Sequence, residues 1–478
     1  MKSLISQFCR RYIGNRAFYR GVLAIAVPMM IQNGITNFVS LLDNIMVGTL
    51  GTEAMSGISI VNQFVFIFNL MVFGAISAAG IFTAQYYGLG DNAGIRNTMR
   101  FKIVINLTVG LALTAAMGIF SEQIINLFLF ESESTGDLAA TMAYGKEYLY
   151  IMLIGLVPYA IAQVYASTMR ETGEVVVPMI ASLVAVGTNF VLNVLLIFGY
   201  LGFPALGVAG AAIATVISRF AELALLVIYA HTHKERFPYM RGLYASLSIP
   251  RSLFRTITKK GIPLMINEFF WAIAMTMRNQ CYSTRGLDVV AAQNISSTVF
   301  NLFSVVYMAL GSSVAIIVGK QLGAGELEEA VDTDRKMITF SIFCGCGVAA
   351  IMAICSLFFP KIYNTGADVQ ALASYMMIVS GLTMPFSAFA NAAYFTLRSG
   401  GKIFITILFD SVYMWAVVIP TTAIFAYLTD INILWLFAIG QGVDTLKMIF
   451  GIIFLKHGGW VNTLVVKTED PIPTTDSV

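Results

Sequence analysis

The chain has 478 residues, of which 58% are hydrophobic and only 12% are charged, with a formal net charge of +3 and a mean hydropathy of +0.78. Soluble domains carry about 25% charged residues, so this composition excludes a soluble enzyme, a nucleic-acid-binding protein and a disordered scaffold. It predicts an all-α polytopic membrane protein.

Apolar runs long enough to cross a bilayer recur along the whole chain. Because about 20 apolar residues cross the hydrocarbon core as a helix, they predict twelve transmembrane helices: 22–47, 56–87, 101–121, 143–169, 175–200, 206–230, 261–284, 289–319, 337–360, 371–397, 403–428 and 433–455. Pro28 in the first helix and Pro263 in the seventh predict kinks, which neighbouring helices can accommodate.

Lysine and arginine are distributed unevenly between the predicted loops. An even number of spans places both termini on one side of the membrane. With that side cytoplasmic, only three of the 29 basic residues lie in outer loops, namely Lys146, Arg285 and Lys361. Cytoplasmic loops of membrane proteins are enriched in basic residues. The sequence therefore predicts a multi-pass plasma-membrane protein with cytoplasmic termini.

A basic segment at 231–260 separates the first six spans from the last six. We interpret it as a solvated cytoplasmic linker near anionic headgroups. The predicted organisation is a six-helix lobe at 1–230, this linker at 231–260, a second six-helix lobe at 261–456, and a cytoplasmic tail at 457–478.

The two halves carry the same landmarks in the same order. Residues 88–91 (Gly-Leu-Gly-Asp) end the second span, and residues 323–326 (Gly-Ala-Gly-Glu) end the eighth at the spacing that separates Pro28 from Pro263. We interpret both Gly-x-Gly pairs as helix C-caps. Two six-span halves in one orientation are parallel repeats, which are typical of secondary transporters with a site between their lobes.

Several kinds of site are missing from the sequence. It has no G-x-x-x-x-G-K-[ST] phosphate loop, so ATP hydrolysis does not power the protein. His231, His233 and His457 all lie at predicted cytoplasmic helix ends, and the five cysteines have no zinc or disulfide spacing. We therefore expect neither an enzyme nor a resident metal or cofactor.

Ionisable residues inside spans are costly in a bilayer and are functional candidates by default. Apart from residues at the span ends, eight are interpreted as intramembrane: Asp43, Arg219, Glu222, Glu268, Arg278, Asp410, Asp444 and Lys447. Arg219 and Glu222 are three residues apart, as are Asp444 and Lys447, so we predict that each pair neutralises itself on one helix. Arg278 lies near a span end and is expected to extend toward the headgroups.

Asp43 and Glu268 have no opposite charge three or four residues away. A carboxyl in a low-dielectric cavity can take up and release a proton, and an ionised one among amide oxygens can hold Na⁺. The predicted cation-coupling residues are Asp43, Glu268, Asn189, Asn193 and Asp410. The predicted cavity or substrate residues are Asn33, Asn267, Arg278 and Ser387.

Several motifs resemble those of the multidrug and toxic compound extrusion (MATE) family. The run 43–51 (Asp-Asn-Ile-Met-Val-Gly-Thr-Leu-Gly) is similar to its first-helix signature, and 85–91, 170–173 and 206–212 are similar to later motifs. The resemblance covers essentially the whole chain. It implies two six-helix lobes that form a V, alternate between outward-open and inward-open states, and export organic cations in exchange for H⁺ or Na⁺.

The resemblance also implies residue roles. Asp43 matches the first-helix acid that takes part in cation coupling, Asn189 matches a fifth-helix amide, and Glu268 resembles the seventh-helix glutamate of the NorM-type sodium site. Asn193 and Ser387 stand where some members of the family carry a further acid. With one carboxyl at each place, we expect H⁺ rather than Na⁺ as the coupling ion.

Two other function classes remain as alternatives. A flippase for an anionic lipid-linked oligosaccharide shares this architecture and would need a cavity rich in arginine and lysine. Apart from residues at the span ends, the basic residues within spans are three: Arg219, Arg278 and Lys447. A receptor or scaffold would need neither the internal repeat nor unpaired acids. The expected partners are small organic cations and the lipid bilayer, with no nucleic acid, and the expected state is a monomer.

Overall fold

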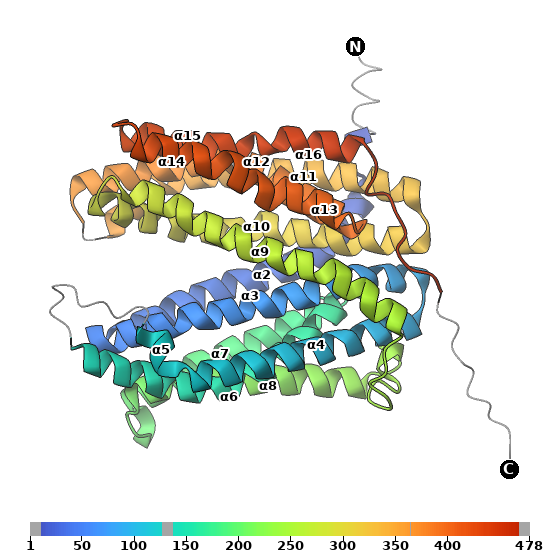
Figure 1. Cartoon of the computed structure of the whole chain (residues 1–478), viewed down its shortest axis with the longest axis horizontal. Helices are drawn as coiled ribbons and strands as arrows, with labels where there is room; N and C mark the ends of the chain where they lie inside the picture. Colours follow the sequence, from blue (N-terminus) through green and yellow to red (C-terminus); the bar gives the residue numbers. More distant parts are fainter. Residues whose placement is uncertain (1–10, 127–136, 364, 468–478) are drawn as a thin grey trace.

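The computed structural model describes residues 11–126, 137–363 and 365–467, and over these it contains helices and no β-strand (Figure 1). The helices of the first half are α2 (Arg16–Gly48), α3 (Thr52–Leu89), α4 (Asn92–Ile119), α5 (Ser121–Asn126), α6 (Leu138–Glu171), α7 (Val176–Phe198), η1 (Tyr200–Gly202) and α8 (Gly207–Thr232). After η2 (Pro238–Met240), the second half contains α9 (Arg251–Ser283), α10 (Leu287–Ala324), α11 (Leu327–Cys355), η3 (Phe359–Ile362), α12 (Ala367–Ser399), α13 (Ile403–Ile407), η4 (Leu408–Val412), η5 (Met414–Val418), α14 (Ile419–Tyr427), α15 (Ile433–Thr445) and α16 (Lys447–Lys456).

Eleven helical segments within these ranges are long and apolar enough to cross a membrane, and they count α13–α14 and α15–α16 as one segment each. The helix α9 has 33 residues, long enough to span, but it is less apolar because it carries Lys259, Lys260, Glu268 and Arg278. Pro28 and Pro263 lie inside α2 and α9 and end neither helix. The chain is a multi-pass membrane protein with an all-α fold, as predicted.

The helices form two groups that lie side by side (Figure 1). The first bundle, α2 to α8, surrounds the largest apolar core, and the second bundle, α9 to α16, contains several smaller ones. The two bundles meet where α2 and α3 of the first contact α9 and α10 of the second. The space between them is therefore lined by the helices that begin each half of the chain.

At one end of this interface α3 and α10 cross so closely that only glycine fits. A Cβ atom on Gly88 would overlap the backbone carbonyl of Lys320, and a Cβ on Gly323 would overlap the backbone carbonyl of Gln85. Because the obstacle in both cases is backbone, a larger side chain would force the helices apart. These two glycines, which are equivalent in the internal repeat, close this end of the interface.

The second glycine of each Gly-x-Gly pair ends its helix. Gly90 has φ 73° and Gly325 has φ 80°, and each caps its helix in the left-handed conformation. This confirms the predicted C-caps. The role of the first glycine in each pair was not predicted, because it depends on a helix from the other half of the chain.

The connection between the bundles is shorter and more buried than predicted. Only residues 233–250 link α8 to α9, because the last ten residues of the predicted linker already belong to α9. Four of its apolar side chains are buried: Phe237, Tyr239, Met240 and Leu243. Arg100 of α4 donates to the carbonyl of Gly242 at 2.7 Å. Most other residues of this linker are exposed to solvent, and the four buried apolar side chains fasten it to the first bundle.

Residues 457–467, which we call the C-terminal strap, run from the second bundle to the first (Figure 1). Trp460 is buried in a core of the second bundle, and Val465 is buried in the core of the first. Between them, the backbone N–H of Leu464 donates to Oε1 of Gln85 at 2.7 Å. The segment predicted as a cytoplasmic tail is thus, in its described part, a strap across the α3–α10 crossing, while 468–478 lie outside the described residues.

Candidate functional site

A cavity of about 1180 Å³ lies between the two bundles. Its walls come from α2, α3 and α6 of the first bundle and mainly from α9, α10, α12 and α15 of the second. Along α10 it reaches from Val290 to Gly319 and stops before Gly323, so the α3–α10 crossing closes one end. The volume suits a small organic ligand.

Eight charged side chains line this cavity, four of each sign: Arg170, Glu171, Glu268, Arg278, Arg398, Asp410, Asp444 and Lys447. Only Arg170 and Glu171 belong to the first bundle. Of the four residues predicted to line the cavity, Asn33, Arg278 and Ser387 do so and Asn267 does not. The charged part of the site therefore belongs mainly to the second bundle.

Two acids of the second bundle that line the cavity are paired with basic residues of other helices. Lys447 Nζ lies 2.6 Å from Asp410 Oδ1, and Arg278 Nη1 lies 3.3 Å from Asp444 Oδ2. The predicted local pair of Asp444 with Lys447 does not form, because the helix is interrupted at Leu446 between them and each side chain meets a different element. Arg278 is buried against Asp444, so the expectation that it extends to the headgroups was wrong.

Asp410 lies in η4, one of two π-helical turns in the eleventh span. Pro420 follows them and has no N–H to donate to the carbonyl of Ala416, which favours a widened helix here. Besides Lys447, Asp410 accepts a hydrogen bond from Asn267 Nδ2 at 3.1 Å. One lysine and one amide thus already occupy this carboxylate, which was predicted to take part in cation coupling.

Glu268 differs from the other cavity acids. It lines the cavity and forms no ion pair with any residue that the structure describes. Its Oε1 accepts a hydrogen bond from the hydroxyl of Tyr394 at 2.6 Å. Ser387 lines the same cavity, but its hydroxyl donates to the carbonyl of Thr383. Among the described residues, Glu268 is therefore the cavity carboxyl that has no ion pair.

A second carboxyl site lies within the first bundle. Asp43 on α2 is not among the cavity-lining residues and instead faces α7, where Asn193 Nδ2 donates to its Oδ1 at 2.9 Å. The Asn189 amide, with its nitrogen turned toward Asp43, donates to Oδ2 at 2.8 Å and accepts from Thr215 at 3.1 Å. The structure thus brings together Asp43, Asn189 and Asn193, and it adds Thr215 of α8, for which the sequence carried no signal.

The predicted pair of Arg219 and Glu222 forms no ion contact. Arg219 lies over the ring of Tyr159 on α6, with its guanidinium 5.1 Å from the ring centroid. A cation over an aromatic face is stabilised by the ring quadrupole. Glu222 is buried on the same helix without an ion pair to any described residue. The spacing along α8 predicted the wrong partner for Arg219, because its actual partner, the ring of Tyr159, belongs to another helix.

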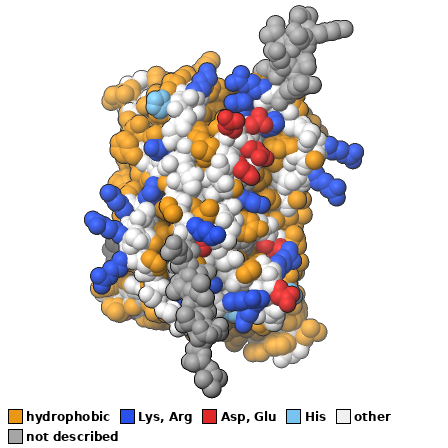
Figure 2. All heavy atoms as spheres, turned by 90° about the vertical axis from the view of Figure 1, so that its right-hand side faces the viewer, with side chains coloured by type: hydrophobic (Ala, Val, Ile, Leu, Met, Phe, Trp, Pro, Cys, Tyr) orange, Lys and Arg blue, Asp and Glu red, His pale blue; other side chains and the backbone are white. Residues whose placement is uncertain are grey.

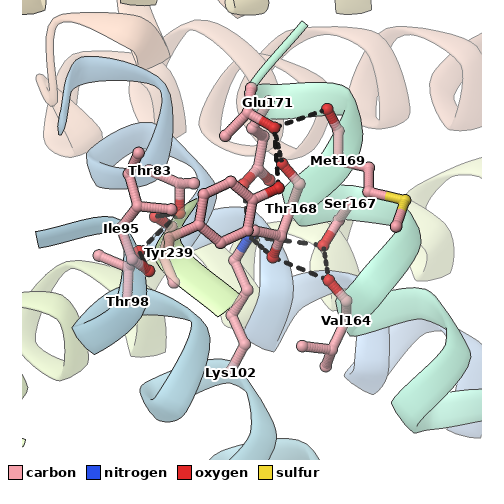
Figure 3. A network of polar contacts seen from close by, with 12 residues as sticks. Thr83, Ile95, Thr98, Lys102, Val164, Ser167, Thr168, Met169, Glu171 and Tyr239 are labelled. Carbon is pink, nitrogen blue, oxygen red and sulfur yellow. Dashed lines mark hydrogen bonds and ion pairs between the residues drawn. The ribbon is translucent and has the colours of Figure 1, made fainter. Parts of the chain in front are cut away.

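One buried ion pair was not predicted. Lys102 of α4 pairs with Glu171 of α6, and the lysine side chain is fully buried (Figure 3). Lys102 lies at the start of the predicted third span, where a lysine is expected to face the cytoplasm. Its burial depends on α6, which no local pattern reveals.

The comparison with known proteins agrees with this architecture. The MatE family model matches residues 28–195 and 263–428, one segment in each half. The "Probable multidrug resistance protein NorM" of Thermotoga maritima is 25% identical over 456 residues, which cover 94% of each chain. The "Probable multidrug resistance protein YoeA" of Bacillus subtilis is 22% identical over 87% of this chain and 89% of its own.

Solved structures show the same fold. The Vibrio cholerae MATE transporter VcmN in its bent form superposes with a TM-score of 0.80 at 15% identity, over 93% of this chain and 97% of that one. A MATE crystal structure in complex with MaL6 gives 0.81 at 18% identity, over 92% and 96%. The chain is therefore a member of the MATE family of efflux transporters, with the V-shaped, two-bundle fold of that family.

Proposed function

We propose that this transporter is a secondary antiporter that exports organic cations from the cytoplasm in exchange for H⁺ or Na⁺. The observation that carries the proposal is the cavity between the bundles, which is closed at the α3–α10 crossing and contains Glu268 as a carboxyl without an ion pair among the described residues. The names of the relatives NorM and YoeA as multidrug resistance proteins support small-molecule cargo.

The cavity walls suit a cargo that is both cationic and apolar. Aromatic side chains that line the cavity together with Glu268 include Trp271, Phe386, Tyr394 and Phe395. Aromatic faces attract cations and offer apolar contact, and Glu268 supplies a negative charge. The cavity has equal numbers of acidic and basic side chains. An anionic lipid-linked cargo would need an excess of basic groups, so the flippase alternative is not favoured.

Alternating access requires the closed end of the cavity to open and the opposite ends of the bundles to approach each other. An ion can drive this change only by binding one arrangement better than the other. Asp43 and Glu268 lie in different bundles, and each has a single carboxylate at its site. Because Na⁺ is commonly held by several oxygen ligands that include carboxylates, while a proton needs one carboxyl, we propose H⁺ as the coupling ion.

Dye transport in proteoliposomes tests the antiport and its ion. A pH gradient or a Na⁺ gradient is imposed separately, an ionophore clamps the other ion, and the movement of ethidium is followed by fluorescence. We expect the pH gradient alone to drive transport and the Na⁺ gradient alone to fail. Transport driven by Na⁺ alone would show that the proton assignment is wrong, and no transport under either gradient would contradict antiport of organic cations.

The proposed orientation places both termini and the α3–α10 crossing in the cytoplasm of a plasma-membrane protein. Lysine and arginine side chains are spread over this end of the molecule (Figure 2). In a background without native cysteines, Ser246→Cys in the linker should not react with an impermeant thiol reagent added to intact cells. Asp430→Cys, between α14 and α15, should react readily. Glu131, also predicted to lie outside, falls in a segment beyond the described residues.

Labelling of Ser246→Cys from outside, in a protein that still transports dye, would reverse the orientation. Both positions are exposed, so accessibility to solvent does not differ between them. A difference in labelling then reports only the side of the membrane.

A further inference from the structure

The ammonium of Lys102 is held by three acceptors from α6. Its Nζ contacts the carboxylate of Glu171, the hydroxyl of Thr168 at 3.2 Å and the hydroxyl of Ser167 at 3.4 Å (Figure 3). Both hydroxyls donate their own protons to the carbonyl of Val164, so they accept from the lysine. Each of the three ammonium protons therefore has an acceptor, and Glu171 is the only one of the three that carries a charge.

Glu171 also reaches the cavity between the bundles. It is one of the residues that line the cavity, and its side chain remains 15% exposed while that of Lys102 is 0% exposed. The carboxylate packs against Gly80 of α3, where a Cβ atom would overlap Oε1. Glu171 thus stands between a buried ammonium on one side and the cargo space on the other.

This placement links the charge state of Lys102 to whether the Glu171 carboxylate binds a cationic cargo. If a cationic cargo draws the carboxylate into the cavity, the ammonium is left buried with two neutral hydroxyls. An uncompensated buried charge is strongly unfavourable, and a lysine in that position becomes stable by giving up its proton. The hydroxyls of Ser167 and Thr168 can then turn to donate to the neutral amine. The other ionisable side chains that face this pair are Arg170 of α6 and Tyr239 of η2.

We propose that Glu171 is a cargo-binding carboxylate of the cavity and that Lys102 is the proton carrier that competes with the cargo for it. When the cargo cation binds Glu171, one N–H bond of the Lys102 ammonium breaks, and the proton passes to cavity water by way of the Ser167 hydroxyl, which contacts Nζ and lines the cavity, leaving a neutral amine. When a proton returns from the opposite side, the ammonium recaptures Glu171 and the cargo leaves. One positive charge is exchanged for another, and no bond between heavy atoms changes.

The proposal rests on the proposed function and adds a proton–cargo exchange within the first bundle, separate from Asp43. The two bundles also differ in where the basic partner of each cavity acid lies. The cavity carboxylates Asp410 and Asp444 pair with Lys447 and Arg278, which themselves line the cavity. Lys102 is outside the cavity lining and reaches it through Glu171 and Ser167, which both line the cavity.

Lys102→Arg is the decisive variant. Arginine keeps the charge and the ion pair but does not release its proton in proteins. We expect the protein to remain folded, the affinity for rhodamine 6G to fall at least tenfold, and efflux driven by a pH gradient to fall at least tenfold. Lys102→Met should raise the affinity for the dye, because no ammonium then competes with the dye for the Glu171 carboxylate. We expect at least tenfold tighter dye binding, with one fewer proton released per dye bound, and loss of pH-driven efflux.

Lys146 provides matched controls. Like Lys102, it pairs with a glutamate, Glu122, but it lies on α6 and the pair is exposed. Lys146→Arg and Lys146→Met should leave dye affinity, proton release and efflux within twofold of the wild type. Dye binding is measured by fluorescence polarisation on purified transporter, proton release with a pH indicator in weakly buffered solution, and folding by thermal unfolding.

Wild-type pH-driven efflux in Lys102→Arg would overturn the proposal, because it is the result expected of a purely structural ion pair. If Lys102→Met does not fold, Glu171→Gln is tested together with Lys102→Arg. Because Glu171→Gln removes the carboxylate that binds the cargo, it must weaken dye binding at least tenfold. Unchanged dye binding in Glu171→Gln would overturn the proposal. If the wild type itself neither binds nor moves the dye, the proposed function fails as well. If the wild type transports dye normally and Lys102→Arg does so at the same rate, only the proposed role of Lys102 fails and the proposed function stands.

Discussion

Asp43→Asn is expected to lower gradient-driven dye efflux at least tenfold without changing the amount of transporter in the membrane. Asparagine keeps the size of the side chain and can still hydrogen-bond with Asn193, which lies 2.9 Å away. What it loses is the ability to bind and release a cation. Because antiport depends on that exchange, the gradient can no longer drive the change between states, whereas dye binding at the cavity should persist.

The measurement is initial efflux in proteoliposomes, with membrane protein quantified on the same samples. Asp368→Asn provides the control, since Asp368 is an exposed acid in the first turn of α12 and lies outside the cavity lining. It should transport at the wild-type rate. Efflux near the wild-type rate in Asp43→Asn would exclude Asp43 from coupling and leave Glu268 and Lys102 as the remaining candidates.

Gly323→Val is expected to abolish transport by preventing closure of the cavity at the α3–α10 crossing. A Cβ at this position would overlap the backbone carbonyl of Gln85, which has no rotamer to adopt. Overpacking of this kind costs about 1–3 kcal/mol. A change of that size in one state shifts the equilibrium between two states by roughly 5–150-fold. The bundles would then remain apart at this end.

Cysteine accessibility tests this expectation. In a background without native cysteines, Ser387→Cys in the cavity should become reactive from the side of the α3–α10 crossing when Gly323 is replaced by valine. Gly347→Val on α11 is the control, because a Cβ at Gly347 would have no atom within 4 Å. If the Gly323→Val protein transports dye normally, the crossing is not a gate.

The sequence predicted the number of membrane-crossing helices and the repeat, because burial in a bilayer leaves long apolar runs that can be read locally. It did not predict the charge pairs. Asp444 and Lys447 satisfy the helix-neighbour spacing, yet an interruption at Leu446 separates them, and their partners Arg278 and Asp410 come from helices far away along the chain.

The same limit applies to the candidate site. Asp43 was identifiable because an unpaired acid in an apolar span is conspicuous, and its partners on α7 followed from the family resemblance rather than from spacing. Lys102 was not identifiable, since a lysine ten residues into α4 has the same appearance in the sequence whether it faces water or Glu171. Tertiary packing alone decides between the two.

The C-terminal strap sets an upper limit on how far the two bundles can separate at their closed end. Trp460 is anchored in one core and Val465 in the other. The five peptide units between them reach at most ~17 Å when fully extended. Any wider opening between these two anchor points requires one side chain to leave its core, so the amplitude of the transport cycle at this end is fixed by the length of a short piece of chain.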